Sequence, residues 1–367
     1  MTAATLCAPA PDAPVHLPPE PVAASVLIVD DSAVARAVIG RVVDGSERFV
    51  VAGSVGDVPA ALRFLARASV DYILLDVNLP GVDGITALPD LIAAGGDAKV
   101  LIVSSTAAEG AAQTVQALAF GAADTLTKPE AGALSGRFAT ALLEKLERLG
   151  DPQPAAPSPP PVLVRPAAPA PRPSSDQYDL VAIGASTGGI HALSRLLREL
   201  PAGFRLPVLV TQHLPATFMP YFAAQLALLA GRPCDVAADH MRIRPGRLVV
   251  APGDAHLTVV PLADGTGAIR LSRAPSASGC MPSVDPMLAS VAATYGARAL
   301  GVVLSGMGRD GAEGARALRE AGGGVVVQDK ASSVIWGMPG AVAGAGLADA
   351  MLPPEAIGQL IARRRRP

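Results

Sequence analysis

Several features common in other protein classes are scarce in this chain. Aromatic residues make up 3% of the sequence, too few for a surface that stacks nucleic-acid bases. The three cysteines, Cys7, Cys234 and Cys280, lie far apart and show neither disulfide nor metal-finger spacing, which predicts a reducing, cytoplasmic setting. The formal net charge of −2 gives no general attraction to nucleic acid or anionic membrane. We therefore expect no nucleic-acid partner.

Long uninterrupted hydrophobic runs are also lacking, although 50% of the residues are hydrophobic. The longest weakly charged stretch, residues 206–231, is broken by three prolines and carries Gln212 and His213. It predicts a strand, a loop and a helix, and not a membrane span. The chain opens Met1-Thr2-Ala3 with no basic region before an apolar core, so no signal peptide and no membrane insertion are predicted.

The length of 367 residues and the composition predict two domains joined by a tether. We predict a disordered extension over residues 1–24 and a first domain over 25–149. A Pro/Ala-rich linker follows over 150–176, then a second domain over 177–362 and a basic tail over 363–367. The proline run favours a spacer over a peptide-recognition segment. The arginines of the tail favour a solvated helix end over an acidic-receptor contact.

Strand and helix patterns alternate through the first domain. Apolar runs at 25–29, 50–54, 72–75, 100–103 and 125–126 predict strands, with helices predicted between them and after the last. This order predicts an α/β fold with a parallel sheet covered on both faces. In such sheets functional side chains gather at the carboxyl ends of the strands.

Polar residues directly follow four of these strands. Asp30 and Asp31 end the first, Asp76 the third, Ser104 the fourth and Lys128 the fifth. Each carboxylate alone is explained equally well as a helix cap. Together, the carboxylates can hold a hard cation such as Mg²⁺, and the whole set can accept and hold a phosphoryl group.

Residues 25–149 resemble a two-component receiver domain, which has a flavodoxin-like fold. The resemblance rests on Leu75-Asp76-Val77-Asn78-Leu79-Pro80-Gly81 and on the strand-end residues above. It implies that Asp76 accepts phosphate from a histidine kinase and that Ser104 and Lys128 form the phosphorylation switch. It also implies a Mg²⁺ site made by Asp30, Asp31, Asp76 and the backbone carbonyl of Asn78.

A sharp turn opens the second domain. The apolar strand before it leads into Gly184-Ala185-Ser186-Thr187-Gly188-Gly189, and a helix-period pattern follows. Three interpretations fit: a nucleophile elbow around Ser186, a phosphate cradle made by the glycines, or a plain strand-to-helix connection. Unpaired backbone N–H groups at the helix start favour a developing negative charge beside Ser186.

A histidine and an aspartate also follow strands of the second domain. His213 comes after the run 207–211 and Asp310 after 299–304, so both can face Ser186 at one sheet edge. A serine nucleophile needs such a base, and the base needs a carboxylate. The order Ser, His, Asp differs from that of α/β-hydrolases. The competing bases are His191, His240 and His256. We predict a doubly wound parallel sheet with a small β-rich segment, including a hairpin at Asp264-Gly265.

Residues 179–352 resemble the catalytic domain of the chemotaxis protein-glutamate methylesterase and glutaminase family. The matching segments are Gly184–Gly189, Gln212–Pro215, Leu248–Asp254, Pro282–Asp285, Ser305–Gly311 and Gly337–Pro339. The resemblance implies a triad of Ser186, His213 and Asp310, an oxyanion pocket at Thr187, Gly188 and Met307, chemoreceptor substrates and no cofactor for the ester hydrolysis.

Two positions depart from the family's pattern: Met281 stands before Pro282 in place of the usual arginine, and Ser305 replaces a threonine. Two other functions remain as alternatives for the second domain. A DNA-binding output lacks a basic recognition helix in this sequence. A nucleotide-binding output lacks the acidic residue expected after its second strand, where Gln212 and His213 stand.

Overall fold

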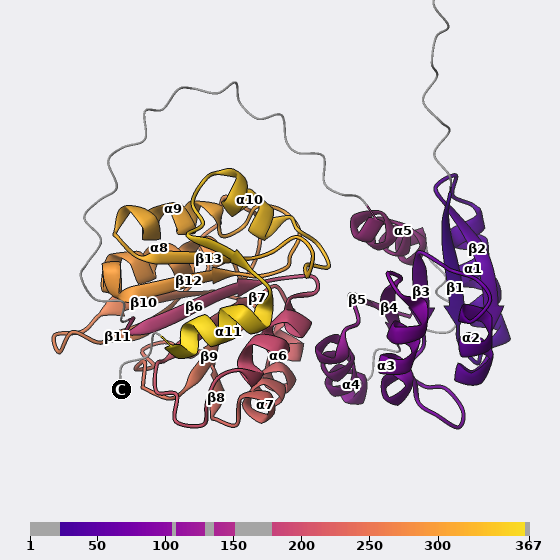
Figure 1. Ribbon diagram of the computed structural model, residues 1–367, viewed down its shortest axis with the longest axis horizontal. Helices are drawn as coiled ribbons and strands as arrows, with labels where there is room; N and C mark the ends of the chain where they lie inside the picture. The colour runs from indigo at the N-terminus through magenta and orange to yellow at the C-terminus, as the bar shows by residue number, and fades with distance from the viewer. Residues whose placement is uncertain (1–22, 105–107, 129–135, 151–177, 364–367) are drawn as a thin grey trace, which may run out of the picture.

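The protein has two α/β domains in a computed structural model (Figure 1). The structure describes residues 23–104, 108–128, 136–150 and 178–363. We refer to residues 23–150 as the N-terminal domain and to 178–363 as the C-terminal domain. Nearly all of the predicted extension, linker and basic tail lies outside the described residues, and Ala24, predicted to be in the extension, begins β1.

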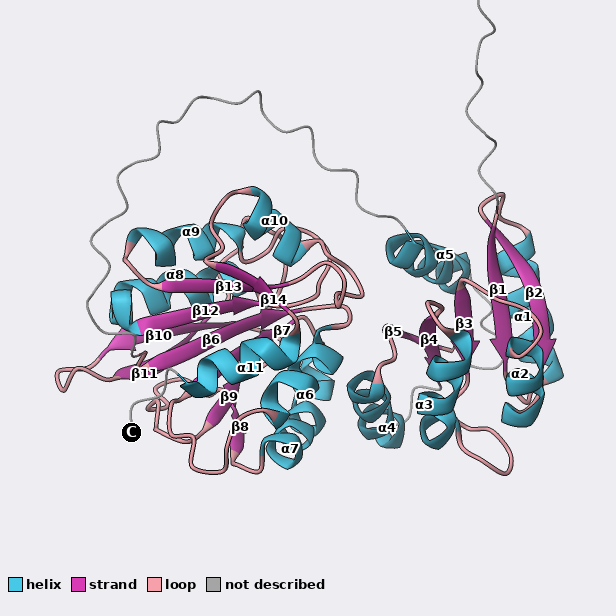
Figure 2. Ribbon diagram, viewed as in Figure 1, coloured by secondary structure: helices cyan, strands magenta, loops and turns pink. Residues whose placement is uncertain are grey.

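The N-terminal domain has a five-stranded parallel sheet, as the sequence predicts (Figure 2). Its strands, in spatial order, are β2 (Phe49–Val55), β1 (Ala24–Val29), β3 (Tyr72–Leu75), β4 (Lys99–Ser104) and β5 (Asp124–Thr127). The helices are α1 (Ala33–Asp44), α2 (Val58–Leu65), α3 (Gly84–Gly95), α4 (Ala108–Phe120) and α5 (Gly136–Gly150).

Burial on both faces explains why the inner strand β1 is apolar from Val26 to Val29. Leu27 and Val29 belong to the core cluster beneath α2, α3 and α4. Val26 and Ile28 point the other way, into the cluster beneath α1 and α5. Because successive side chains of a strand alternate between faces, a strand covered on both sides needs apolar residues at every position.

The C-terminal domain is built on a seven-stranded parallel sheet. Its strands, in spatial order, are β14 (Ala350–Leu352), β13 (Gly324–Gln328), β12 (Ala299–Val303), β6 (Leu180–Ala185), β7 (Val208–Gln212), β9 (Leu248–Val250) and β8 (Cys234–Val236). Its α-helices are α6 (Gly189–Arg198), α7 (Met219–Ala230), α8 (Val284–Tyr295), α9 (Ala312–Glu320), α10 (Met338–Gly344) and α11 (Pro354–Arg363).

Helices cover both faces of this sheet, which makes it doubly wound. Val181 and Ile183 of β6 pack into the cluster with α6, α7 and α11. Leu180 and Ala182 face the opposite cluster, with α8, α9 and α10. The predicted hairpin is confirmed: β10 (His256–Pro261) and β11 (Gly267–Ser272) pair antiparallel around Asp264-Gly265. The remaining elements are two short 3₁₀ turns, η1 (Ala216–Phe218) and η2 (Gly296–Arg298).

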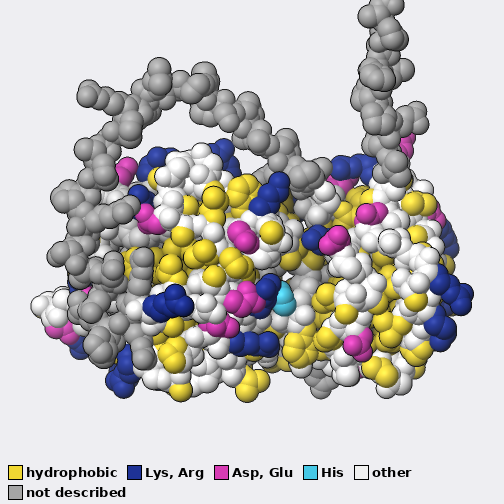
Figure 3. Space-filling view, in the orientation of Figure 1, with side chains coloured by type: hydrophobic (Ala, Val, Ile, Leu, Met, Phe, Trp, Pro, Cys, Tyr) yellow, Lys and Arg dark blue, Asp and Glu magenta, His cyan; other side chains and the backbone are white. Residues whose placement is uncertain are grey.

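The two domains meet through α4, which packs against α6, α7 and η1 (Figure 1). Leu118 of α4 and Ile190 of α6 belong to one buried apolar cluster. On the face shown in Figure 3, acidic and basic side chains are interspersed over both domains. Among the helices that the structure describes, none is long and apolar enough to cross a membrane.

Gly184, near the end of β6, allows the start of α8 to approach the strand closely. A Cβ atom at this position would lie 2.3 Å from Val284 Cγ1. We expect Gly184→Ala to lower the free energy of unfolding of the C-terminal domain by about 1–3 kcal/mol, because it overpacks a buried contact. Urea unfolding followed by the fluorescence of Trp336, the chain's one tryptophan, reports on this domain.

Gly344→Ala is the matched control for this prediction. Gly344 ends α10, and a Cβ atom there meets no other atom within 4 Å. This variant should unfold at the wild-type urea concentration or slightly above it, since alanine favours helix. Equal destabilisation by both substitutions would contradict the contact with Val284.

Candidate active site

Three neighbouring strands place the serine, the histidine and the aspartate at one edge of the sheet. β6 lies between β7 and β12 and is parallel to both. Ser186 follows β6, His213 follows β7, and Asp310 lies in the loop after β12. Because parallel strands end on the same side, residues distant in sequence meet there.

The histidine bridges the other two side chains. His213 Nδ1 lies 3.1 Å from Ser186 Oγ, and Nε2 lies 2.7 Å from Asp310 Oδ2. With a proton on Nε2, the ring donates to the carboxylate and turns an acceptor nitrogen toward the serine hydroxyl. This is the arrangement of nucleophile, base and orienting acid that acyl transfer requires.

Asp310 is buried, with 2% of its surface exposed, and its charge is compensated by surrounding donors. Besides the ring of His213, the donors to its two oxygens are Ser283 Oγ, Val284 N, Asp285 N and Gly311 N. A buried carboxylate needs such partners, since an uncompensated charge would oppose folding. The donors at the start of α8 were not predicted from the sequence.

The environment stabilises opposite charges on the aspartate and the histidine. Burial alone would raise the pKa of Asp310, but its hydrogen bonds with His213, Ser283 and Val284 outweigh this and hold the pKa below its ordinary value. Burial lowers the pKa of His213, but hydrogen bonds with Asp310 and Cys280 raise it overall, to about 9. The ring is therefore a strong base once its Nδ1 is deprotonated.

The turn after β6 directs the half-buried Ser186 toward His213 and shapes its backbone. Gly188 has φ 75°, a left-handed conformation that glycine adopts without strain. The N–H of Gly189 donates back to Ser186 O at 2.8 Å, and Gln212 Nε2 donates to the same carbonyl at 2.9 Å. The helix begins at Gly189, so the N–H groups of Thr187 and Gly188 are the nearest candidates for an oxyanion site.

The N-terminal domain covers this turn. The N–H of Gly188 donates to the backbone carbonyl of Ala123, between α4 and β5, at 3.2 Å. A small hollow of about 50 Å³ remains beside Ser186, and residues of both domains line it. Two side chains of α6, His191 and Ser194, reach Ala119 O at 3.1 Å. The described structure is therefore a closed arrangement.

The other described histidines do not reach the serine. His191 faces the N-terminal domain, and burial lowers its pKa. His240 is exposed beside Asp239. His256 is buried in β10, where its Nδ1 accepts the N–H of Ser283 at 2.9 Å. Of the competing bases, His213 alone is placed to deprotonate Ser186.

A second polar cluster lies at the carboxyl edge of the N-terminal sheet. Lys128 Nζ lies 2.7 Å from Asp30 Oδ2 and 2.6 Å from Asp76 Oδ2. Carboxylate oxygens of Asp30, Asp31 and Asp76 lie within 4.8 Å of one another. An all-oxygen set of this kind fits Mg²⁺. Burial raises the pKa of Asp76, although Lys128 opposes the shift.

The remaining predicted residues of this cluster are partly placed. Ser104 is the last residue of β4 and is in register with Thr127, next to Lys128. The N–H of Asn78 donates to Asp76 Oδ1 at 3.2 Å. The roles of the Asn78 carbonyl and of the Ser104 hydroxyl stay predictions.

Comparison with known proteins decides the family. The CheB methylesterase family model matches residues 181–361, and the response regulator receiver domain model matches residues 26–135. A protein-glutamate methylesterase/protein-glutamine glutaminase of Caulobacter vibrioides is 43% identical over 93% of this chain and 99% of its own length. This chain belongs to the CheB methylesterase family.

Two further proteins are similar to this chain, one over most of its length and one over about half of it. A protein-glutamate methylesterase/protein-glutamine glutaminase of Azospirillum brasilense is 39% identical, over 92% of this chain and 91% of its own length. The crystal structure of the Thermotoga maritima CheB methylesterase catalytic domain is 33% identical, with a TM-score of 0.49, and the match covers 51% of this chain and 98% of that one. We refer below to the N-terminal domain as the receiver domain and to the C-terminal domain as the methylesterase domain.

The departures from the family pattern lie close to the triad. Met281, in place of the usual arginine, is 41% exposed. Ser305 keeps the hydroxyl, which donates to Thr187 O at 2.8 Å and supports the turn. Met307 is 37% exposed and follows Gly306, whose added Cβ would lie 2.8 Å from Ser186 Cβ. Met307 does not line the small hollow, so its pocket role stays a prediction.

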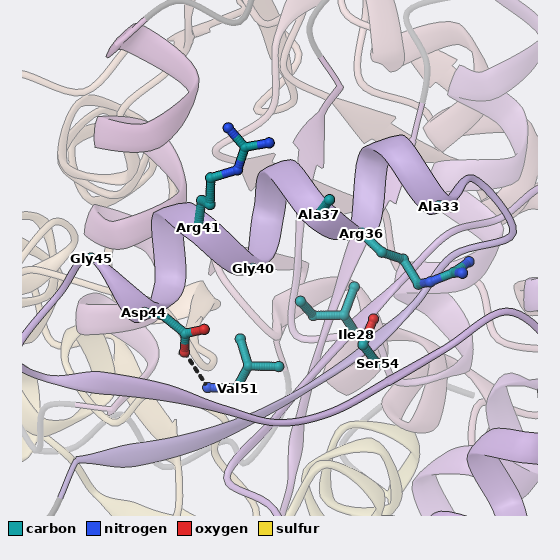
Figure 4. Close-up of a pocket in the computed structure, with 10 residues that line it drawn as sticks. All are labelled: Ile28, Ala33, Arg36, Ala37, Gly40, Arg41, Asp44, Gly45, Val51 and Ser54. Atoms are coloured by element: carbon teal, nitrogen blue, oxygen red, sulfur yellow. Dashed lines mark hydrogen bonds between the residues drawn. The ribbon is translucent and has the colours of Figure 1, made fainter.

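A larger hollow lies far from this chemistry, in the other domain. It has a volume of about 610 Å³ and lies between α1 and β2 of the receiver domain (Figure 4). Arg36 and Arg41 line it, and Asp44 accepts the N–H of Val51 at 2.9 Å. No nucleophile with an adjacent base lines it, so the smaller hollow at Ser186 is the candidate active site.

Replacing Asp310 by asparagine tests the charge in the triad. We expect Asp310→Asn to lower kcat roughly 10⁴-fold, because an amide neither stabilises the imidazolium nor fixes the ring's tautomer. The base acts when deprotonated, so activity rises with pH through the pKa of His213. Because Asp310 raises that pKa, the residual activity of the variant should rise at a lower pH than that of the wild type.

Ser283→Ala is the control for this prediction. It removes one of several donors to Asp310 and leaves the ring's own bond intact. Its loss of activity should be much smaller, and its pH profile should stay near that of the wild type. An Asp310→Asn variant with the wild-type rate and pH profile would contradict the triad.

Proposed function

We propose that this chain removes methyl groups from glutamate methyl esters on chemoreceptor helices and converts glutamine side chains there to glutamate. The observation that carries the proposal is the contact of His213 with both Ser186 and Asp310 in a member of this family. The relatives' names give both activities, methylesterase and glutaminase.

In the first step, Ser186 Oγ attacks the γ-carbonyl carbon of the ester while His213 Nδ1 takes the hydroxyl proton. The ring then carries a proton on each nitrogen, and Asp310 stabilises its positive charge through Nε2. The Nδ1 proton passes to the methoxy oxygen, methanol departs, and an acyl-enzyme remains. Water attacks this ester by the same route in reverse, releasing glutamate and restoring Ser186.

A glutamine side chain follows the same steps and releases ammonia in place of methanol. In both reactions the carbonyl oxygen becomes negatively charged. The N–H groups of Thr187 and Gly188 are the proposed donors to it, and one such donor is worth roughly 3 kcal/mol in the barrier. The elbow interpretation of the turn thus fits the structure better than a nucleotide cradle, because the N–H of Gly189 is already bonded to Ser186 O.

Removing the serine hydroxyl tests the reaction. We expect Ser186→Ala to abolish methanol release from methylated receptor, because it removes the hydroxyl that His213 Nδ1 would deprotonate. A gas-phase or coupled-enzyme assay of methanol measures the loss, and receptor binding by the variant should persist. Full methanol release by Ser186→Ala would sink the assignment.

The receiver domain is proposed to inhibit the esterase by covering it. In the closed arrangement the Ala123 carbonyl accepts the N–H of Gly188, which is one of the proposed oxyanion donors. A substrate carbonyl and the receiver domain therefore compete for one N–H group. Release of the receiver domain frees both the donor and the approach to Ser186.

Phosphorylation of Asp76 is proposed to favour release. A histidine kinase is the proposed phosphodonor, in the cytoplasm. Asp30, Asp31 and Asp76 would hold Mg²⁺, which neutralises charge on the phosphoryl group when bound. The added phosphoryl group changes the partners of Lys128, which now contacts Asp30 and Asp76. Lys128 follows β5, close in sequence to the docking residue Ala123.

The phosphorylation response gives a second test. We expect a small-molecule phosphodonor with Mg²⁺ to raise wild-type methanol release severalfold and to leave Asp76→Asn at its basal rate. Deleting residues 1–176 should raise the basal rate and abolish the response. An Asp76→Asn variant that responds like the wild type, or a deletion that lowers the basal rate without relieving inhibition, would contradict this regulation.

A further inference from the structure

A thiol lies beside the triad at a position that the reaction does not use. One ligand atom each of His213, Cys280 and Asp310 lies within 4.8 Å of the others. Cys280 belongs to the loop between β11 and α8, so its place beside His213 is a feature of the folded chain. The other described free cysteine, Cys234, lies in β8, away from the triad.

We propose that His213, Cys280 and Asp310 form a binding site for Zn²⁺ that switches the esterase off. An imidazole nitrogen, a thiolate sulfur and a carboxylate oxygen are the three donor types that zinc takes in proteins. A thiolate and a carboxylate together carry two negative charges, which balance one divalent cation in a partly buried place. The same set disfavours Mg²⁺, which takes oxygen ligands.

The ligands are held in place before any metal arrives. Asp310 is fixed by its backbone donors, as described above. The Cys280 loop is tied to the same carboxylate through serines: Ser278 Oγ accepts the N–H of Cys280 at 3.3 Å and lies 3.2 Å from Ser283 Oγ. Ser283 Oγ in turn donates to Asp310 Oδ1 at 2.7 Å. Residues that hydrogen-bond to metal ligands, as these serines do to Cys280 and Asp310, orient the ligands and strengthen metal binding.

The site is also reachable. Cys280 is partly exposed, and Met281 beside it is exposed, whereas Asp310 is buried. A cation can therefore reach the sulfur first and then the ring and the carboxylate. Three protein ligands leave one position of a tetrahedral zinc for water.

Zinc at this place would stop catalysis by occupying the base. On His213 Nε2 the metal takes the position of the proton shared with Asp310, and the ring's remaining proton then lies on Nδ1, facing Ser186. A ring that carries its proton there donates to the serine hydroxyl and cannot accept its proton. Inhibition by this route rests on the proposed function, whereas metal binding itself does not.

Binding is tested on the full-length chain, freed of metal with a chelator and kept in excess Mg²⁺ to fill the receiver carboxylates. Co²⁺ is the spectroscopic probe for the zinc site. The wild type should bind one Co²⁺ with a thiolate-to-cobalt absorption band, and Zn²⁺ should displace it. Cys280→Ser should lose the band and bind Zn²⁺ at least about tenfold more weakly by calorimetry. Cys234→Ser should match the wild type.

Inhibition is measured as methanol release against free Zn²⁺, each variant normalised to its own zinc-free rate. Wild type and Cys234→Ser should be inhibited at the concentration that fills the cobalt site, and Cys280→Ser should need at least about tenfold more. No thiolate band in the wild type, or equal zinc affinity in Cys280→Ser, would overturn the site. Binding at Cys280 without loss of methanol release would overturn its inhibitory role, and so would an esterase that is active only with zinc. A chain that shows the cobalt band but releases no methanol with or without zinc would count against the proposed function alone.

Discussion

The bond between His213 Nε2 and the buried carboxylate of Asp310 is the interaction on which the active site depends. It joins β7 to the loop after β12, and the other donors to Asp310 come from the start of α8 and from Gly311. One desolvated charge thus fixes the relative positions of three segments far apart in sequence. Its burial would oppose folding without these donors, so the geometry for catalysis and the stability of this sheet edge arise from the same contacts.

The sequence was informative wherever a candidate site residue lies at or shortly after the end of an apolar run. Ser186, His213 and Asp310 do so in one domain, and Asp30 and Asp76 do so in the other. In a parallel sheet the carboxyl ends of the strands lie at one edge, whatever their distance along the chain. Residues that follow apolar runs in the sequence can therefore be predicted to lie close together in the fold. The α/β class and the parallel sheets were predictable for the same reason, because strands buried on both faces are apolar throughout.

Features set by loops were not predictable in this way. Ser283 and Cys280 reach the triad through a loop between β11 and α8, and no periodicity fixes where such a loop goes. The docking of Ala123 on Gly188 depends on two domains that fold around separate sheets. The outer strands β8 and β14 are three residues long, which is too short to show a recognisable apolar/polar alternation in the sequence. The residues of β8 are also only partly buried.

In the proposed mechanism the Gly188 N–H serves both docking and catalysis, so the two are mutually exclusive. A hydrogen bond to the Ala123 carbonyl in the closed form has to be given up before the same N–H can stabilise a charged carbonyl oxygen. The free energy of domain docking is therefore added to the barrier of the reaction, and each 1.4 kcal/mol of docking reduces the active fraction tenfold. A modification at Asp76 needs no direct contact with Ser186 to act. It is enough that it changes the stability of an interface in which one hydrogen bond uses a proposed oxyanion donor.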